Sequence, residues 1–332
     1  MKRKVLILSV AILIIAITGI ASLQWCSRPP SKGMECIFTV EKGWGARRIS
    51  QVLSDSGLVR CRLYLLWSYS RLDGSPPMQA GIYYFDDSMT PDSILGILTR
   101  GDVLPVETSW VTISPGLTLT QSISLLSEGT GIPLIVLESL STDSIFLVSN
   151  DLPVLEGYLF PETYEFADTL DASEILTRII QTGKARWPED IDELLENTGL
   201  TLHETIILAS IVEREARVDS ERAVVAGVFL SRMRNGMKLE SCATVQYALG
   251  FVKEVLLYSD LEIEDPYNTY LYEGLPPGPI CSPGLPSIDA AFSPDTAEGY
   301  LYFVSREDGT GIHLFARTYR GHLANIRSTA GR

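Results

Sequence analysis

The sequence predicts an α+β protein in which a small α+β module and a larger mixed α/β domain follow an N-terminal transmembrane helix. Three observations lead to this prediction. Residues 5–23 carry no charged side chain, a strand–turn–helix pattern occurs twice before residue 130, and helical periodicity dominates residues 152–250. The chain has 332 residues, of which 45% are hydrophobic and 20% are charged. This composition is typical of a folded globular protein and excludes wholesale disorder.

The overall charge excludes one large class of function. The chain has 27 basic and 41 acidic residues, which give a formal net charge of −14. Proteins that bind nucleic acid neutralise phosphates with clustered lysine and arginine side chains. We therefore expect no nucleic-acid partner.

The first predicted element is a membrane anchor over residues 5–23. Nineteen helical residues span about 28 Å, which is close to the hydrocarbon thickness of a bilayer. Lys2, Arg3 and Lys4 precede the stretch, so the positive-inside rule keeps residues 1–4 in the cytoplasm. A cleaved signal peptide is the alternative, but no small residues stand directly before Cys26. We expect a single-pass protein of the inner (plasma) membrane, with its body outside the cytoplasm.

The next predicted element is a short linker over residues 24–34, followed by a module over residues 35–104. Residues 37–40 are β-rich, and apolar residues with helical spacing follow them up to Gly57. A second strand over residues 80–85 and a capped helix over residues 90–98 complete the module. It resembles the LysM-like module of cell-wall proteins, although a purely structural α+β module is the alternative.

The larger domain is predicted over residues 105–332. It starts with a second strand–turn–helix pattern, with the strand at residues 111–113 and the helix before Gly129. Thr201 and Glu204 form a T-x-x-E capping box, which predicts a helix over residues 202–216. A further helix is expected over residues 221–235, and the last part, residues 300–315, is typical of a β-hairpin around Asp308-Gly309.

Five cysteines allow disulfides in an exported protein. Pairing neighbours along the chain predicts Cys36–Cys61 and Cys242–Cys281, and Cys26 is left over. Connectivity cannot be deduced from sequence alone. No cysteine or histidine spacing indicates zinc, so we expect no metal.

Two carboxylates at the end of the 202–216 helix are the main candidates for chemistry. Glu213 and Glu215 point about 200° apart, so only one of them can face a given cleft. Glu215 shares a stripe with aliphatic side chains, and desolvation there raises the pKa of a carboxyl, as a general acid requires. The alternative is a pair of solvated or salt-bridged carboxylates with a structural role.

Polar and aromatic residues elsewhere are candidates for contacts to a carbohydrate. The run over residues 155–164 is apolar and aromatic and contains Glu156 and Glu162, and blocks rich in amides, hydroxyls and tyrosines follow after residue 240. A loop that proline stiffens for packing is the alternative. The candidate substrate-binding residues are Glu213, Glu162, Thr244, Gln246, Tyr247, Tyr267, Asn268 and Thr269.

The order of five segments resembles the endolytic murein transglycosylase (YceG-like) family. The segments are residues 156–164, 209–215, 225–232, 267–270 and 274–278. The resemblance implies that the larger domain is catalytic and cleaves peptidoglycan glycan strands internally, between N-acetylmuramic acid and N-acetylglucosamine. It implies 1,6-anhydro product ends, control of strand length, Glu215 as the catalytic residue with Glu213 as the reserve, and peptidoglycan synthases as candidate partners.

This reaction needs one carboxyl and no cofactor. A glutamic acid can protonate the glycosidic oxygen and then, once ionised, take the proton from the C6 hydroxyl of muramic acid. Two other hypotheses remain open. One is a non-catalytic wall-binding anchor, and the other is a hydrolase that uses Glu215 together with Glu162.

Overall fold

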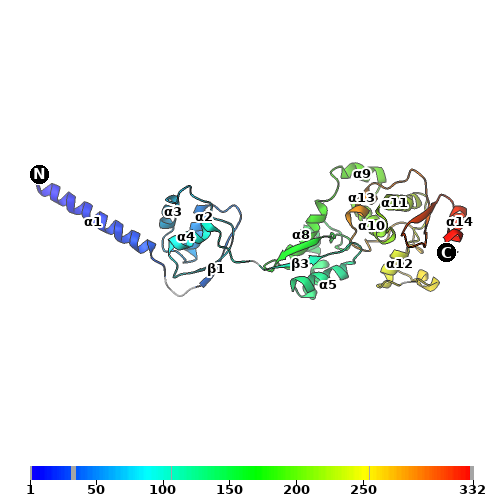
Figure 1. The fold of residues 1–332 in the computed structure, drawn as a ribbon, viewed down its shortest axis with the longest axis horizontal. Coiled ribbons are helices and arrows are strands. Elements are labelled where there is room, and N and C mark those ends of the chain that lie inside the picture. The colour runs from blue at the N-terminus through cyan, green and yellow to red at the C-terminus, as the bar shows by residue number, and fades with distance from the viewer. Residues whose placement is uncertain (1, 31–34, 106, 254, 330–332) are drawn as a thin grey trace. The chain divides into compact units, whose positions relative to one another are not determined.

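The chain forms two units, Met1–Glu107 and Thr108–Arg332, close to the predicted boundary between residues 104 and 105. The computed structural model describes residues 2–30, 35–105, 107–253 and 255–329, with side chains from residue 13 onward. Residues 31–34 of the predicted linker and the side chains of residues 5–12 lie outside this description. Figure 1 traces both units from the N-terminus in blue to the C-terminus in red.

The first unit is one long helix followed by a two-stranded antiparallel sheet with helices (Figure 1). Its elements are α1 (Lys2–Ser27), β1 (Glu35–Val40), α2 (Ala46–Asp55), α3 (Arg62–Ser70), β2 (Gly81–Asp86) and α4 (Pro91–Arg100). In α4 the Thr90 hydroxyl accepts the Ser93 N–H at the start, and Gly101 ends the helix with a left-handed φ of 74°. The predicted strands and the capped helix of this module are confirmed.

The core of the first unit lies between its sheet and its helices. Phe38, Val40, Tyr83 and Phe85 alternate with outward-facing residues along β1 and β2 and pack on Ile49, Leu53, Leu65 and Leu98 of the helices. Ile37 of β1 is paired across the strands with Tyr84, and both side chains are exposed. The sheet therefore has one face buried under helices and one open face.

The stretch predicted as the membrane anchor falls inside α1. Among the described residues, no helix combines the length and the apolar composition that crossing a membrane requires.

The predicted disulfide pairing is wrong. Cys26 at the end of α1 is bonded to Cys61 at the start of α3, with their Cα atoms 5.3 Å apart. Cys36, Cys242 and Cys281 are free thiols. Pairing by sequence order failed because the return of the chain from α2 brings Cys61 beside the end of α1, 35 residues earlier. Cys281 is buried and donates to the Ser210 carbonyl, whereas Cys242 is exposed beside the Tyr270 hydroxyl.

The second unit starts with another strand, helices and an antiparallel strand. Its first elements are β3 (Thr108–Thr112), α5 (Leu119–Thr130), α6 (Leu134–Ser141), α7 (Ser144–Ser149), β4 (Thr163–Ala167) and α8 (Ala172–Lys184). The helix α5 continues through Gly129, where it was expected to end, and stops at Gly131. A Cβ on Gly129 would overlap the side chain of Val111 on β3, so this glycine permits close contact between helix and strand.

The rest of the second unit is mainly helical and ends in a hairpin and a helix. Its elements are α9 (Ile191–Thr198), α10 (Leu202–Glu215), α11 (Asp219–Arg234), α12 (Cys242–Leu249), the 3₁₀-helix η1 (Tyr258–Glu262), α13 (Leu285–Phe292), β5 (Tyr302–Ser305), β6 (His313–Ala316) and α14 (Tyr319–Thr329). In Figure 1, α10 lies with α11 and α13, on which it packs. The predicted 202–216 and 221–235 helices and the hairpin are confirmed to within a few residues.

The fold is α+β. The strand pairs of the described residues are all antiparallel and form three two-stranded sheets. The larger unit therefore has segregated small sheets and helices, in place of the predicted mixed α/β arrangement. One apolar cluster lies under β3 and β4, and a second surrounds α10.

Candidate active site

The helix α10 positions both candidate carboxylates at its C-terminal end. Thr201 and Glu204 form the predicted capping box, in which the Thr201 hydroxyl accepts the Glu204 N–H and the Glu204 carboxylate accepts the Thr201 N–H. Every residue from Thr205 to Val212 is buried. Because the helix is fixed by its cap and by packing around its whole circumference, the residues that follow Val212 are presented at a defined place.

Three protein groups contact one oxygen of the Glu213 carboxylate. Its Oε2 atom accepts the Gly284 N–H at 3.0 Å and the Ser287 hydroxyl at 2.8 Å, and lies 3.4 Å from the Arg222 guanidinium. The side chain is 9% exposed. The carboxylate therefore anchors the start of α13, which is at odds with the expectation that Glu213 binds substrate.

Glu215 has a different environment from Glu213. Its side chain is half-buried, and its Oε1 atom accepts a hydrogen bond from the Ser241 hydroxyl at 2.5 Å. Ser241 is the residue directly before α12. The two carboxylates contact different elements, Glu213 the start of α13 and Glu215 the start of α12.

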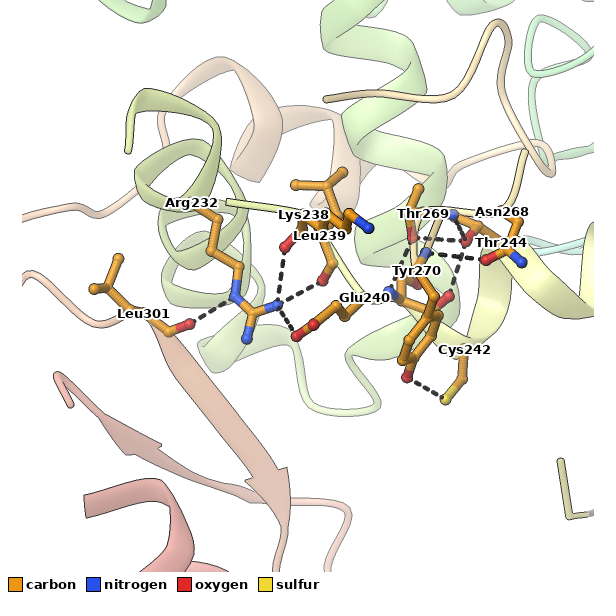
Figure 2. A network of polar contacts seen from close by, with 11 residues as sticks. Arg232, Lys238, Leu239, Glu240, Cys242, Thr244, Asn268, Thr269, Tyr270 and Leu301 are labelled. Carbon is orange, nitrogen blue, oxygen red and sulfur yellow. Dashed lines mark hydrogen bonds and ion pairs between the residues drawn. The ribbon is translucent and has the colours of Figure 1, made fainter. Parts of the chain in front are cut away.

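A polar network fixes the segment that carries Ser241 (Figure 2). The buried Arg232 donates to the carbonyls of Leu301, Lys238 and Leu239 and contacts the Glu240 carboxylate at 3.1 Å. Glu240 itself has a left-handed φ of 52°, which is unusual for a residue other than glycine. The network holds this strained residue, and so it determines where Ser241 meets Glu215.

Three of the residues predicted to contact sugar belong to this scaffold instead. Thr244 and Asn268 are 0% exposed, and Thr269 is 2% exposed. The Thr269 hydroxyl accepts the Ser241 N–H at 3.0 Å and pairs with the Thr244 hydroxyl. The Asn268 amide donates to the carbonyls of Leu261 in η1 and of Ile263, the residue directly after η1. Figure 2 shows Thr244 and Thr269 bonded to each other. Their burial corrects the expectation of direct contact.

A cavity of about 430 Å³ lies beside α12. Residues from five segments line it: Thr118, Thr120 and Gln121 at the start of α5; Glu156; Arg214; Ala243, Gln246, Tyr247, Gly250, Phe251 and Val252 of α12 and the loop after it; and Ile280. The Tyr247 ring lies 4.7 Å from the Tyr267 ring, centroid to centroid. Of the predicted contact residues, the structure places Gln246 and Tyr247 on the cavity and Tyr267 against it.

Glu156 is the carboxyl on this cavity. Its two oxygens accept the Leu119 N–H at 2.9 and 3.1 Å, and Oε2 also accepts the Tyr247 hydroxyl at 3.1 Å. Burial raises the pKa of Glu156 to about 7, and these hydrogen bonds oppose the shift. The sequence analysis places Glu156 in the apolar run over residues 155–164, but the predicted site residues do not include it. Its apolar neighbours, Leu155 and Tyr158, are the signal of burial that could have identified it.

Glu162 does not reach this cavity. Glu162 stands directly before β4, and its carboxylate lies 3.4 Å from the Arg186 guanidinium. The sequence run that contains both carboxylates turns between them, so Glu156 faces α12 and Glu162 faces the end of α8. Glu162 is thus not among the residues that line the cavity, whereas Glu156 is.

The site as a whole consists of acids, hydroxyls, an arginine and aromatic rings. Glu215 meets Ser241 at one end of α12, and Glu156 meets Tyr247 six residues later, about 9 Å along a helix axis. Within the described ranges, no group of three or more His, Cys, Asp or Glu side chains is placed to hold a metal ion. The fold and the site thus define a class, an α+β protein with one buried acid on a polar and aromatic cavity and a second acid at the start of the helix that lines it.

The comparisons with known proteins identify the family within that class. The YceG-like family model matches residues 38–328, so the chain belongs to this family. The endolytic murein transglycosylase of Bacillus subtilis is 30% identical over 304 residues, with 86% of this chain and 82% of that protein covered.

More distant relatives agree with this assignment. The endolytic murein transglycosylase of Streptococcus pneumoniae strain D39 is 27% identical, with 86% of this chain and 57% of that protein covered. The crystal structure of a yceG-like protein from Listeria monocytogenes is 27% identical, with a TM-score of 0.58 over 87% of this chain and 98% of that one.

Proposed function

We propose that this protein is an endolytic murein transglycosylase, which cleaves peptidoglycan glycan strands without a cofactor. Membership of the YceG-like family and the names of two relatives support this activity. The structural observation that carries the proposal is the position of Glu215, which is half-buried at the end of α10 and bonded to Ser241, two residues before the cavity-lining Ala243. Glu213 differs because Gly284, Ser287 and Arg222 hold its Oε2 atom and its side chain is only 9% exposed.

Glu215 acts first as an acid and then as a base. The protonated carboxyl gives its proton to the glycosidic oxygen, and the bond from that oxygen to C1 of N-acetylmuramic acid breaks. The resulting carboxylate takes the proton of the C6 hydroxyl as this oxygen bonds to C1. The products are a 1,6-anhydro end and a new free end on N-acetylglucosamine. Because the nucleophile is part of the substrate, the second step is intramolecular, which is a large advantage over attack by free water.

The substrate lies along α12 in this proposal. Gln246, Tyr247 and Tyr267 bind sugar, because aromatic faces suit the C–H faces of a pyranose ring and amides suit its hydroxyls. Ser241 orients Glu215 and is a positioning residue. Glu213, Thr244, Asn268 and Thr269 hold the frame from which these groups project.

The mass of the product separates the proposal from a hydrolase. The cavity carboxyl Glu156 is the group that could activate water in place of Glu162. Purified sacculi are digested with the protein, and the released fragments are analysed by mass spectrometry. A transglycosylase leaves anhydro ends, which are lighter by one water than the reducing ends that a hydrolase leaves. Reducing ends alone would refute the proposal, and the absence of any fragment would favour a non-catalytic wall-binding protein.

The proposal includes anchoring in the inner (plasma) membrane. In it, residues 5–23 cross the membrane once, with the N-terminus in the cytoplasm and the chain from residue 24 onward outside. The uncharged stretch and the three basic residues before it support this topology. The first unit serves as a LysM-like module that contacts glycan. An enzyme held there meets strands as they are made and limits their length, and peptidoglycan synthases are its expected neighbours.

A further inference from the structure

The apolar surface of α1 continues onto a second helix of the first unit. From Leu13 to Trp25 the large apolar side chains of α1 are exposed. On α3, Leu63 is 74% exposed and Trp67 is 45% exposed, and their spacing of four residues puts them on one helix face. The two surfaces meet at an apolar groove of about 410 Å³, which Leu23 of α1 and Leu63 and Trp67 of α3 help to line.

Covalent and polar contacts fix α3 beside the end of α1. The Cys26–Cys61 disulfide joins the two helices at the edge of the groove. The Arg60 guanidinium donates to the Pro29 carbonyl at 2.9 and 3.1 Å and lies 5.2 Å from the centre of the Trp25 ring. The face of α3 is therefore held where α1 ends and cannot turn away from it.

The composition of this face is that of a membrane interface. Tryptophan and tyrosine concentrate at the level of lipid headgroups, and arginine side chains reach anionic phosphates from there. Trp25, Tyr64 and Trp67 supply the rings, and Arg71 lies 4.8 Å from the centre of the Trp67 ring. The nearby acid, Asp92, is bound by the hydroxyls of Tyr64 and Ser68.

We infer that the α3 face, defined as Leu63, Tyr64 and Trp67, lies in the outer surface of the lipid bilayer, with an acyl chain in the groove between α1 and α3. The bilayer is chosen as the occupant because the face continues the surface of the predicted span and is tied to its end. The first unit is then held against the membrane, at a fixed height. This inference rests on the membrane anchoring in the proposed function.

The test uses the full chain in vesicles of phosphatidylethanolamine and phosphatidylglycerol. The photoreactive residue benzoylphenylalanine is placed at position 63 or 67, and lipid adducts are measured by mass spectrometry after illumination. Positions 37 and 84 are matched controls. Ile37 is 69% exposed and Tyr84 is 42% exposed, close to the values for Leu63 and Trp67, but both lie on the open face of the β1–β2 sheet.

We expect several-fold more lipid adduct at positions 63 and 67 than at positions 37 and 84. Equal yields at the two pairs would overturn the inference. Position 17, within the predicted span, separates this failure from failure of the anchor. Adducts at position 17 without adducts at 63 and 67 would refute only the docking of α3, whereas no adducts at 17 would refute the anchor as well.

A second measurement uses the natural tryptophans, so it does not require the protein to fold with a photoreactive residue in place. Lipids brominated near the headgroup quench nearby tryptophan fluorescence. Trp67→Phe should remove part of the quenched signal, and Trp110→Phe, at an exposed residue of the second unit, should not. An unchanged quenched signal in Trp67→Phe would contradict the inference.

Discussion

Glu213 and Glu215 stand two positions apart on α10, and the groups that contact them separate their roles. Gly284, Ser287 and Arg222 contact one oxygen of Glu213, whereas Glu215 accepts a hydrogen bond from the Ser241 hydroxyl and is half-buried at the start of α12. A carboxyl that must exchange protons with a substrate has to be accessible to that substrate, and the Glu213 side chain is only 9% exposed. This difference leads to a prediction about each residue.

Glu215→Gln should lower the release of anhydro-ended products by about 100-fold or more. The amide keeps the size of the side chain but has no acidic proton to transfer.

Glu213→Gln should keep catalysis in the folded protein but lower its stability by about 1–3 kcal/mol, because the charge that is hydrogen-bonded near Arg222 is lost. Product release and thermal unfolding are measured for both variants. Near-normal turnover in Glu215→Gln together with an inactive, stable Glu213→Gln would reverse the assignment.

Glu156 should make stability fall as the pH rises. Burial raises its pKa from 4.5 to about 7 in the folded protein, so between these values the unfolded chain ionises while the folded chain stays protonated. The stability that the neutral carboxyl contributes is therefore full below about pH 4.5 and is lost by about pH 7. The loss amounts to about 3 kcal/mol.

The comparison for this prediction is Glu156→Gln, which cannot ionise. The unfolding free energy of both proteins is measured from pH 4 to pH 8. The difference between them should change in favour of the variant across this range and level off near neutral pH. A difference that does not vary with pH would show that Glu156 is not desolvated.

At the scale of elements, the packing of α11 depends on a glycine in its interior. A Cβ at Gly227 would overlap the backbone oxygen of Asp295. The main chain at Asp295 is held in place because its N–H donates to the Ala223 carbonyl. At Gly96 in α4, a Cβ would meet only the Arg100 guanidinium at 3.1 Å, at the flexible end of a side chain. The two glycines therefore differ in what surrounds them, although both lie inside helices.

Substituting alanine should have opposite effects at these two positions. Gly96→Ala should stabilise the first unit by about 0.5–1 kcal/mol, because alanine favours the helix. Gly227→Ala should destabilise the second unit by about 1–3 kcal/mol, because the clash with main chain outweighs the same helix preference. Denaturant unfolding of both variants checks this, and a stabilised Gly227→Ala would contradict the packing of α11.

At the scale of the molecule, the residues proposed for chemistry and the predicted membrane span lie in different units. Glu215, Ser241 and the cavity all lie within Thr108–Arg332. The Cys26–Cys61 disulfide, by contrast, lies in the first unit and joins the end of α1 to the start of α3. A shortened chain intended to fold normally should therefore begin before Cys26, for example at Gln24, so that Cys61 keeps its partner.

Such a shortened chain should still release anhydro-ended fragments from purified peptidoglycan, because the reaction needs no part of the predicted span. When it is exported in soluble form, it should not replace the full-length protein in cells, because it no longer meets strands where they are made. Both forms are compared at matched abundance. Full replacement by the soluble form would show that anchoring does not determine where the enzyme acts.

Local sequence determined much of this protein by itself. The capping box at Thr201 and Glu204, the Thr90 cap and Gly101 stop of α4, and the Asp308-Gly309 hairpin depend on residues a few positions apart, so their patterns predicted the elements correctly. The opposite directions of Glu213 and Glu215 follow from helix geometry in the same way.

Only the tertiary structure decided which distant residues meet. It paired Cys26 with Cys61, placed Glu156 rather than Glu162 on the cavity, and buried Thr244, Asn268 and Thr269 beneath Ser241. Residue type shows that a side chain can bond, but not which partner the fold brings within reach. The desolvation that raises the pKa of Glu156 likewise comes from α5 and α12, which lie far from it in sequence.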